Sequence, residues 1–179
     1  MVKVAGKKSA ESDAEHSYQL AMFVWYLNEI HHNGLDADLL IKYALVHDLV
    51  EVYAGDTDSL ISSSLISTKA FREKRALVKL EKELKDFPEI LNIIHDYEGR
   101  INPESRFVYV VDKLIPFINA YFAKQNDYYQ KNKITYSSLR AHKEFKIRSV
   151  DPNLLHDKFV QETLKYLSTL KGFYYEDAT

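Results

Sequence analysis

The amino-acid sequence predicts an all-α protein that folds as a single domain, a bundle of about six helices. Five glycines and four prolines in 179 residues are too few for the many tight turns of a β protein. Apolar residues recur every three or four positions in most long segments, which is the period of an amphipathic helix. No internal repeat or linker-like stretch interrupts residues 1–179, so one domain is expected.

The first two expected helices have clear sequence boundaries. An apolar face marks the first, from about residue 13 to 30, and consists of Leu20, Phe23, Val24, Leu27 and Ile30. Asn33 and Gly34 end this helix, and Asp36 or Asp38 can cap the next one, since short acids accept hydrogen bonds from free N–H groups at a helix start. The second helix should continue to Ala54, before Gly55.

A serine-rich loop is expected over residues 56–68, followed by four further helices. These cover about residues 69–85, 88–99, 103–125 and 152–170. Pro88 and Pro103 stand where helices begin, a position that tolerates the missing N–H of proline. The stretch FVYVV after Pro103 could form a strand because of its β-branched residues, but the length and apolar spacing of the segment favour a helix, with a kink expected at Pro116.

Composition excludes several classes of protein. A formal charge of −2 gives no electrostatic basis for binding nucleic acid or an anionic membrane. No apolar run approaches the roughly 20 residues that cross a bilayer, so a cytoplasmic protein is expected. The sequence has no cysteine, which leaves histidine and carboxylate side chains as the ligands for any metal.

The segment YALVHDLVEVYAGD places charged residues among valines and leucines. In a continuous helix Ala44, His47, Asp48 and Glu51 would form one stripe, and burying such a stripe is costly unless something compensates the charge. The simpler alternative is a buried histidine held by an acid or a carbonyl.

The expected buried faces of two other helices also contain a polar residue, His16 in one and Asp112 in the other. Two histidines and two aspartates suit a divalent cation. The remaining candidates, His95-Asp96, His156-Asp157 and His31-His32, are expected to be surface or helix-end residues.

The order of the candidate ligands resembles that of HD-domain metal-dependent phosphohydrolases. It consists of a histidine, then a His-Asp pair, then a distant aspartate. The stretches ESDAEHS, HDLVEVYAGD, KAFREKRA, YE and PESRFVYVVDKL resemble motifs of the 5′-deoxynucleotidase branch, and the likeness covers about residues 9–120. It implies an HD-type helical fold and one divalent ion, which could be Mn, Co, Mg, Zn, Ni or Fe. It also implies hydrolysis of (deoxy)nucleoside 5′-monophosphates by attack of a metal-bound water.

The resemblance assigns a role to each matching residue. The implied metal ligands are His16, His47, Asp48 and Asp112. Glu51 would orient or deprotonate the attacking water, and Asp56 would contact the nucleotide or assist proton transfer. The implied substrate contacts are Asp56, Thr57, Asp58, Ser59 and Lys69.

Two arginine positions depart from the pattern of this branch. The sequence contains no Arg-Trp motif, and Ser9 occupies the position of a second family arginine. Lys3, Lys7 and Lys8 are the nearby cations that could replace these arginines, although lysine lacks the bidentate fork.

The expected partner is a small phosphate ester, and relatives suggest a homodimer. Phe117, Tyr121 and Phe122 could form its interface, or could equally belong to the core. Two other functions remain open, namely an HD phosphodiesterase or pyrophosphohydrolase and a catalytically degenerate metal-binding HD module.

Overall fold

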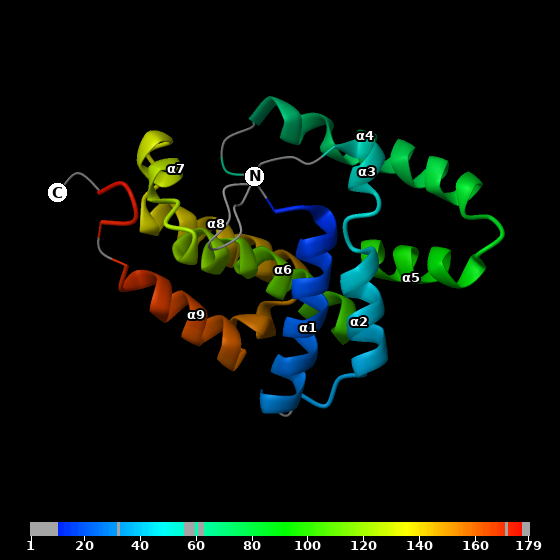
Figure 1. Cartoon of the computed structure of the whole chain (residues 1–179), viewed down its shortest axis with the longest axis horizontal. Coiled ribbons are helices and arrows are strands. Elements are labelled where there is room, and N and C mark those ends of the chain that lie inside the picture. The colour runs from blue at the N-terminus through cyan, green and yellow to red at the C-terminus, as the bar shows by residue number, and fades with distance from the viewer. Residues whose placement is uncertain (1–10, 32, 56–59, 61–62, 171, 177–179) are drawn as a thin grey trace.

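The computed structural model describes residues 11–31, 33–55, 60, 63–170 and 172–176, and for residues 63–66 it describes the backbone alone. All regular elements within these ranges are helical, which confirms the all-α prediction (Figure 1). In chain order they are α1 (Asp13–His31), α2 (Ala37–Val46), α3 (Glu51–Ala54), α4 (Ser63–Glu83), α5 (Pro88–Gly99), α6 (Pro103–Phe122), α7 (Asn126–Lys131), α8 (Tyr136–Val150), the 3₁₀ helix η1 (Pro152–His156) and α9 (Lys158–Ser168). None of the described helices is both long and apolar enough to cross a bilayer.

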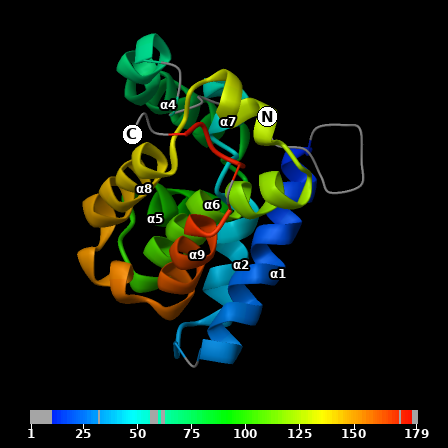
Figure 2. The ribbon, with the colours of Figure 1, turned by 90° about the vertical axis from the view of Figure 1, so that its left-hand side faces the viewer.

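Helix α6 forms the centre of the main core. It packs against α1, α2, α5, α8 and α9, and Figure 2 shows it enclosed by these helices. Apolar side chains bury most of its surface, including the fully buried Val108, Val111 and Leu114. Because α6 is enclosed in this way, a polar side chain on it, such as Asp112, is buried.

Local capping explains why the helices around this core begin where they do. The Asp36 carboxylate accepts hydrogen bonds from two backbone N–H groups at the start of α2. Asn102 and Ser105 form a reciprocal capping box at the start of α6, and Pro103 occupies its first position. Helix α6 continues through Pro116 to Phe122, so the packing around it overrides the helix-breaking tendency of proline.

The prediction of one continuous helix ending at Ala54 is wrong. Helix α2 ends at Val46 and α3 begins at Glu51. In between, the chain makes tighter turns, with the Leu49 N–H donating to the Val46 carbonyl at 3.0 Å. The His47 imidazole bonds the Ala44 carbonyl at 2.8 Å, which competes for the acceptor that a continuing α-helix would use. Asp48 therefore lies in a turn, and Glu51 lies on a separate helix.

Three other boundaries also differ from the prediction. Helix α4 begins at Ser63, several residues inside the expected loop. The last segment divides into η1 and α9 because the Asp157 side chain caps α9 by accepting from two of its N–H groups. Residues 126–150 form two helices that the sequence did not reveal, since α8 has a mostly polar sequence without a distinct apolar stripe.

Aromatic side chains form a second core beneath the C-terminal segment. Phe117 and Tyr121 of α6 pack there with Tyr129, Phe173 and Tyr174. The core interpretation of Phe117 and Tyr121 is therefore confirmed. Phe122, in contrast, is 61% exposed.

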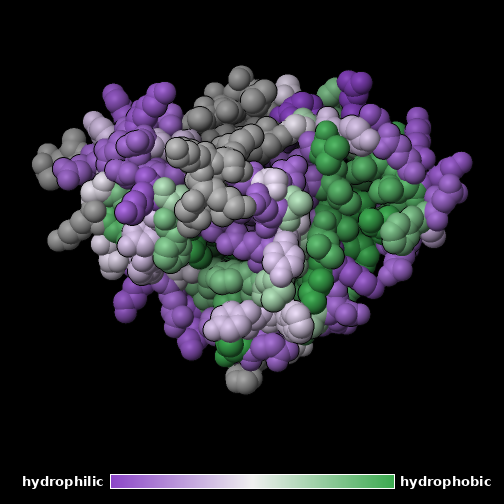
Figure 3. Space-filling view, in the orientation of Figure 1, coloured by the Kyte–Doolittle hydropathy of each residue, from purple (hydrophilic) through white to green (hydrophobic). Residues whose placement is uncertain are grey.

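A third core joins α3, α4 and α5 through Val50, Ala76 and Ile94. Part of its outer surface is apolar, and Figure 3 shows hydrophobic atoms gathered where the end of α2, α3, α4 and α5 meet. Val52 and Leu45 are among the exposed apolar side chains of these elements.

Candidate metal centre

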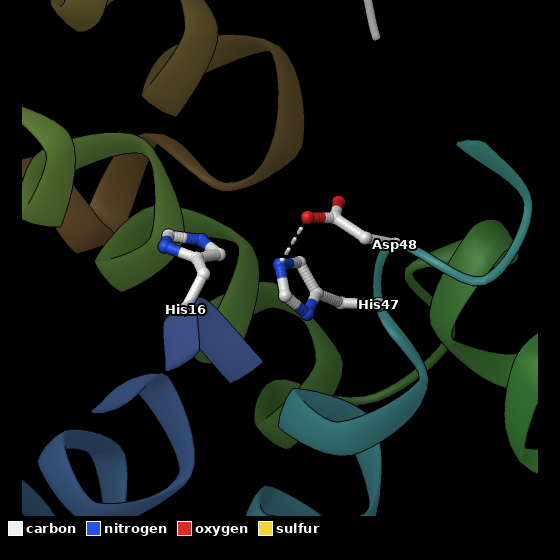
Figure 4. A group of neighbouring side chains, drawn as sticks. All are labelled: His16, His47 and Asp48. Carbon is white, nitrogen blue, oxygen red and sulfur yellow. Dashed lines mark ion pairs between the residues drawn. The ribbon is translucent and has the colours of Figure 1, made fainter. Parts of the chain in front are cut away.

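Three separate parts of the fold bring four predicted ligands together. His16 comes from the first turn of α1, His47 and Asp48 from the turn after α2, and Asp112 from the middle of α6. His16 Nε2 lies 3.1 Å from Asp112 Oδ1, while His47 Nε2 lies 3.0 Å from Asp48 Oδ2 and 3.7 Å from Asp112 Oδ1. Figure 4 shows the two histidine rings and the Asp48 carboxylate arranged around a common space.

The His47 ring is oriented by a hydrogen bond on its outer side. Its Nδ1 lies 2.8 Å from the Ala44 carbonyl, so Nδ1 carries the proton and donates it. The other nitrogen, Nε2, faces Asp48 and Asp112, is buried, and makes no hydrogen bond. A histidine whose outer nitrogen is fixed by a carbonyl while its inner nitrogen faces two carboxylates has the arrangement of a metal ligand.

Charges around Asp112 keep it ionised although it is buried. Burial favours the neutral acid, but the ammonium of Lys113, 2.6 Å from Oδ2, and the nearby His16 hold the pKa of Asp112 well below its usual range. For His16, burial acts against the charged form, yet Asp112 and Glu11 together raise its pKa to about 10. The second histidine, His47, also has a raised pKa because Asp48 and Asp112 outweigh its burial. Protons therefore neutralise the carboxylates when no cation is bound.

The spacing of these atoms suits a divalent ion. Two ligands each about 2.1 Å from an ion, at tetrahedral or octahedral angles, lie about 3.0–3.4 Å from each other. The measured separations of 3.0, 3.1 and 3.7 Å are close to this range. Ligand atoms of His16, His47 and Asp48 all lie within 4.8 Å of one another, and Asp112 Oδ1 approaches both histidines. The donor set, with His47 Nε2 facing the carboxylates of Asp48 and Asp112, therefore fits a divalent ion.

Glu51 lies outside this ligand cluster and pairs with another predicted site residue. Its Oε1 is 3.1 Å from the Lys69 ammonium on α4. Lys69 also contacts Glu73, at 3.2 Å, and these two carboxylates raise its pKa against the effect of burial. The other predicted residues, Asp56, Thr57, Asp58 and Ser59, lie outside the described residues.

His95 and His156 are surface residues and His31 is a helix-end residue, as predicted. His95 is exposed and lies 3.1 Å from Glu81, and His156 is exposed at the end of η1. His31 ends α1, and His32 lies outside the described residues.

Sequence reasoning missed two charged residues that contact the cluster. Glu11 approaches His16 Nδ1 at 3.5 Å, and Lys113 binds Asp112. The position of Lys113 directly after a buried aspartate was a usable signal, because a buried acid needs a cation. Glu11 gave no comparable signal, since it precedes the first helix and only the fold directs it towards His16.

Comparison with known proteins supports the helical fold. The family described as HD domain matches residues 2–153. The chain belongs to the HD domain family. Two solved structures share its fold. A predicted metal-dependent phosphohydrolase from Magnetospirillum magnetotacticum has a TM-score of 0.73 at 21% identity. The match covers 97% of this chain and 85% of the phosphohydrolase chain. The PH0347 protein from Pyrococcus horikoshii has a TM-score of 0.61 at 23% identity. The match covers 90% of this chain and 87% of the PH0347 chain.

Curated relatives of this HD-domain chain are named 5′-deoxynucleotidase. HDDC2 of Danio rerio is 34% identical over 116 residues, which are 64% of this chain and 56% of the relative. Hdd1 of Schizosaccharomyces pombe is 27% identical over 114 residues, 60% of this chain and 56% of the relative. HDDC2 of Dictyostelium discoideum is 28% identical over 141 residues, 74% and 73% of the two chains. The chain thus spans about half the length of the first two of these relatives.

Proposed function

We propose that this HD-domain chain is a metal-dependent phosphohydrolase that removes phosphate from small phosphomonoesters, with (deoxy)nucleoside 5′-monophosphates as the substrate class. The observation that carries this proposal is the buried Nε2 of His47, which faces two carboxylates and lies beside a second histidine. Such a set suits a divalent cation, and phosphomonoester hydrolysis is chemistry that one cation can support. The names of the curated relatives point to the same reaction.

The residues that would hold one divalent ion are His16, His47, Asp48 and Asp112, which are the nitrogen and oxygen donors accepted by Mn, Co, Mg, Zn, Ni and Fe. When bound, such an ion lowers the pKa of a water molecule and neutralises charge on phosphoryl oxygens. Among the residues that the structure describes, His16, His47 and Asp48 form the one group of histidines and acids whose ligand atoms lie close enough to hold a metal, and Asp112 approaches both histidines.

Glu51 is proposed as the general base. It lies one turn beyond Asp48, and its backbone N–H donates to the Asp48 carbonyl at 2.9 Å, so the ligand turn fixes where Glu51 begins α3. The Glu51 carboxylate is held 3.1 Å from the Lys69 ammonium. Lys69 also belongs to the proposed substrate contacts, together with Asp56, Thr57, Asp58 and Ser59, and Asp56 would assist proton transfer.

A panel assay tests the proposed reaction. The purified chain, loaded with Mn²⁺, Co²⁺, Mg²⁺ or Zn²⁺, is incubated with ribo- and deoxyribonucleoside 5′-monophosphates, a non-nucleotide phosphomonoester and a phosphodiester. Phosphate release is expected from the monoesters and should stop when a chelator removes the metal. Release from the diester alone would instead assign a phosphodiesterase. No release with any metal would indicate a metal-binding module without this activity.

We also propose that the chain forms a homodimer and works in the cytoplasm, where nucleoside monophosphates are produced and consumed. Large apolar side chains on the outer side of α1 support the dimer: Tyr18, Met22, Trp25 and Tyr26. Aromatic residues and methionine are enriched in protein interfaces. Light scattering of the wild type and of Trp25→Glu tests the dimer, and fractionation of cells tests the location. A monomeric wild type would refute the dimer.

A further inference from the structure

Helices α6 and α8 lie side by side in antiparallel orientation, and two contacts fix their register (Figures 1 and 2). Near the start of α6, Arg106 Nη1 lies 3.4 Å from Asp151 Oδ2, just beyond the end of α8. Further along α6, the Phe117 ring centroid lies 4.3 Å from the Lys143 ammonium. Moving forward along α8 therefore corresponds to moving backward along α6.

Lys146 lies between these two contacts, one turn after Lys143. Interpolation along the two helices places it level with the turn of α6 that carries Asp112 and Lys113. The neighbouring Ile147 is fully buried in the main core, and Lys146 itself is half-buried. Its side chain therefore leaves α8 at the edge of the face that packs on α6, at the level of Lys113.

Lys146 and two other lysines, Lys69 on α4 and Lys113 on α6, differ in their partners. Lys69 on α4 is held by two carboxylates, and Lys113 on α6 is held by Asp112. Within the described part of the chain, the Lys146 ammonium has no carboxylate within ion-pair distance. Burial and the charges of Lys113 and Lys69 lower the pKa of Lys146, and the opposing charge of Glu73 only partly offsets them.

A half-buried cation beside other cations is unfavourable unless an anion approaches it. We propose that Lys146, supported by Lys113 and Lys69, forms a subsite that binds the phosphate group of the substrate. This inference deepens the proposed function and rests on it for the identity of the substrate. The subsite gives α8 a role in binding and explains why a lysine stands at the edge of a packed helix face.

The test compares the affinity of the metal-loaded protein for inorganic phosphate, measured by calorimetry, with the KM for a nucleoside monophosphate. Lys146→Gln removes the charge, and Arg148→Gln is the matched control because it removes an exposed cation from the same helix, two residues away. In Lys146→Gln, phosphate affinity should fall about tenfold, and KM should rise by a similar factor, since a charge-assisted hydrogen bond is lost. Arg148→Gln should change both by less than about twofold, and Lys146→Arg should restore most of the binding.

Each outcome distinguishes the subsite from the proposed reaction. Wild-type phosphate affinity in Lys146→Gln, or an equal loss in Arg148→Gln, would overturn the subsite even if hydrolysis proceeds. Phosphate binding that depends on Lys146 without turnover of any monoester would leave the subsite standing and refute the proposed function. Circular dichroism checks that the variants are folded, and Lys146→Glu should weaken phosphate binding more than Lys146→Gln does.

Discussion

Replacing Glu51 by glutamine tests the chemical role assigned to α3. Glutamine has nearly the same shape as glutamate but cannot accept a proton, so the variant removes the base and leaves the packing intact. Glu51 is not part of the ligand cluster, and its carboxylate is bound to the Lys69 ammonium at 3.1 Å. The variant should therefore still bind metal.

The expected size of the effect follows from these contacts. Loss of a general base should lower kcat by about 10²–10⁴-fold, which corresponds to a barrier about 2.7–5.5 kcal/mol higher. The free energy of unfolding should change by less than about 1 kcal/mol, because the ion pair with Lys69 is partly exposed to solvent. The Glu51→Gln variant should thus lose most of its activity while its stability remains close to that of the wild type.

Glu73→Gln is the matched control, since Glu73 is the other carboxylate on Lys69, at 3.2 Å. The assay measures phosphate release, metal content and thermal unfolding for both variants. Turnover by Glu51→Gln within about threefold of the wild type, with metal still bound, would refute the assignment of the base. An equal loss in Glu73→Gln would show that the charge balance at Lys69, and not proton transfer, accounts for the effect.

Three further outcomes are expected. At pH 7 the metal-free His16 is protonated, because its pKa is raised to about 10, so metal binding should release at least one proton and strengthen as the pH rises. Calorimetry in two buffers of different ionisation heat checks this, and identical heats would contradict it. Asn102→Ala should lower the free energy of unfolding by about 1–2 kcal/mol, measured in urea, since it removes the α6 cap and the 2.6 Å hydrogen bond to the buried Tyr43 hydroxyl. Leu114→Ala, at a fully buried position, should cost about 2–5 kcal/mol in the same measurement, whereas Leu45→Ala, at a side chain 52% exposed, should cost under about 1 kcal/mol.

The sequence predicted the helical class and the converging ligands because both depend on local pattern. Apolar spacing identified α1 and α6, and the same spacing showed that His16 and Asp112 face inward. The break after Val46 could not be read from spacing, since it depends on a side chain bonding to the backbone. His47 takes the Ala44 carbonyl as an acceptor, and this contact decides that α2 ends.

Residues that act through tertiary contacts were harder to foresee. Helix α8 has mostly polar residues, so neither its existence nor the position of Lys146 followed from periodicity. The pairing of Glu51 with Lys69 joins α3 to α4, and that proximity exists only once the two helices fold against each other. Lys69 was predicted as a substrate contact from resemblance alone, and its two carboxylate neighbours were not foreseen.

Titration with Mn²⁺, followed by electron paramagnetic resonance, measures most directly whether the four side chains hold one dication. The wild type is expected to bind one Mn²⁺ ion per chain. His47→Gln and Asp112→Asn should each abolish that site while the helical circular dichroism is retained. A wild type that leaves all Mn²⁺ free in solution, or variants that bind it as tightly as the wild type, would contradict the account.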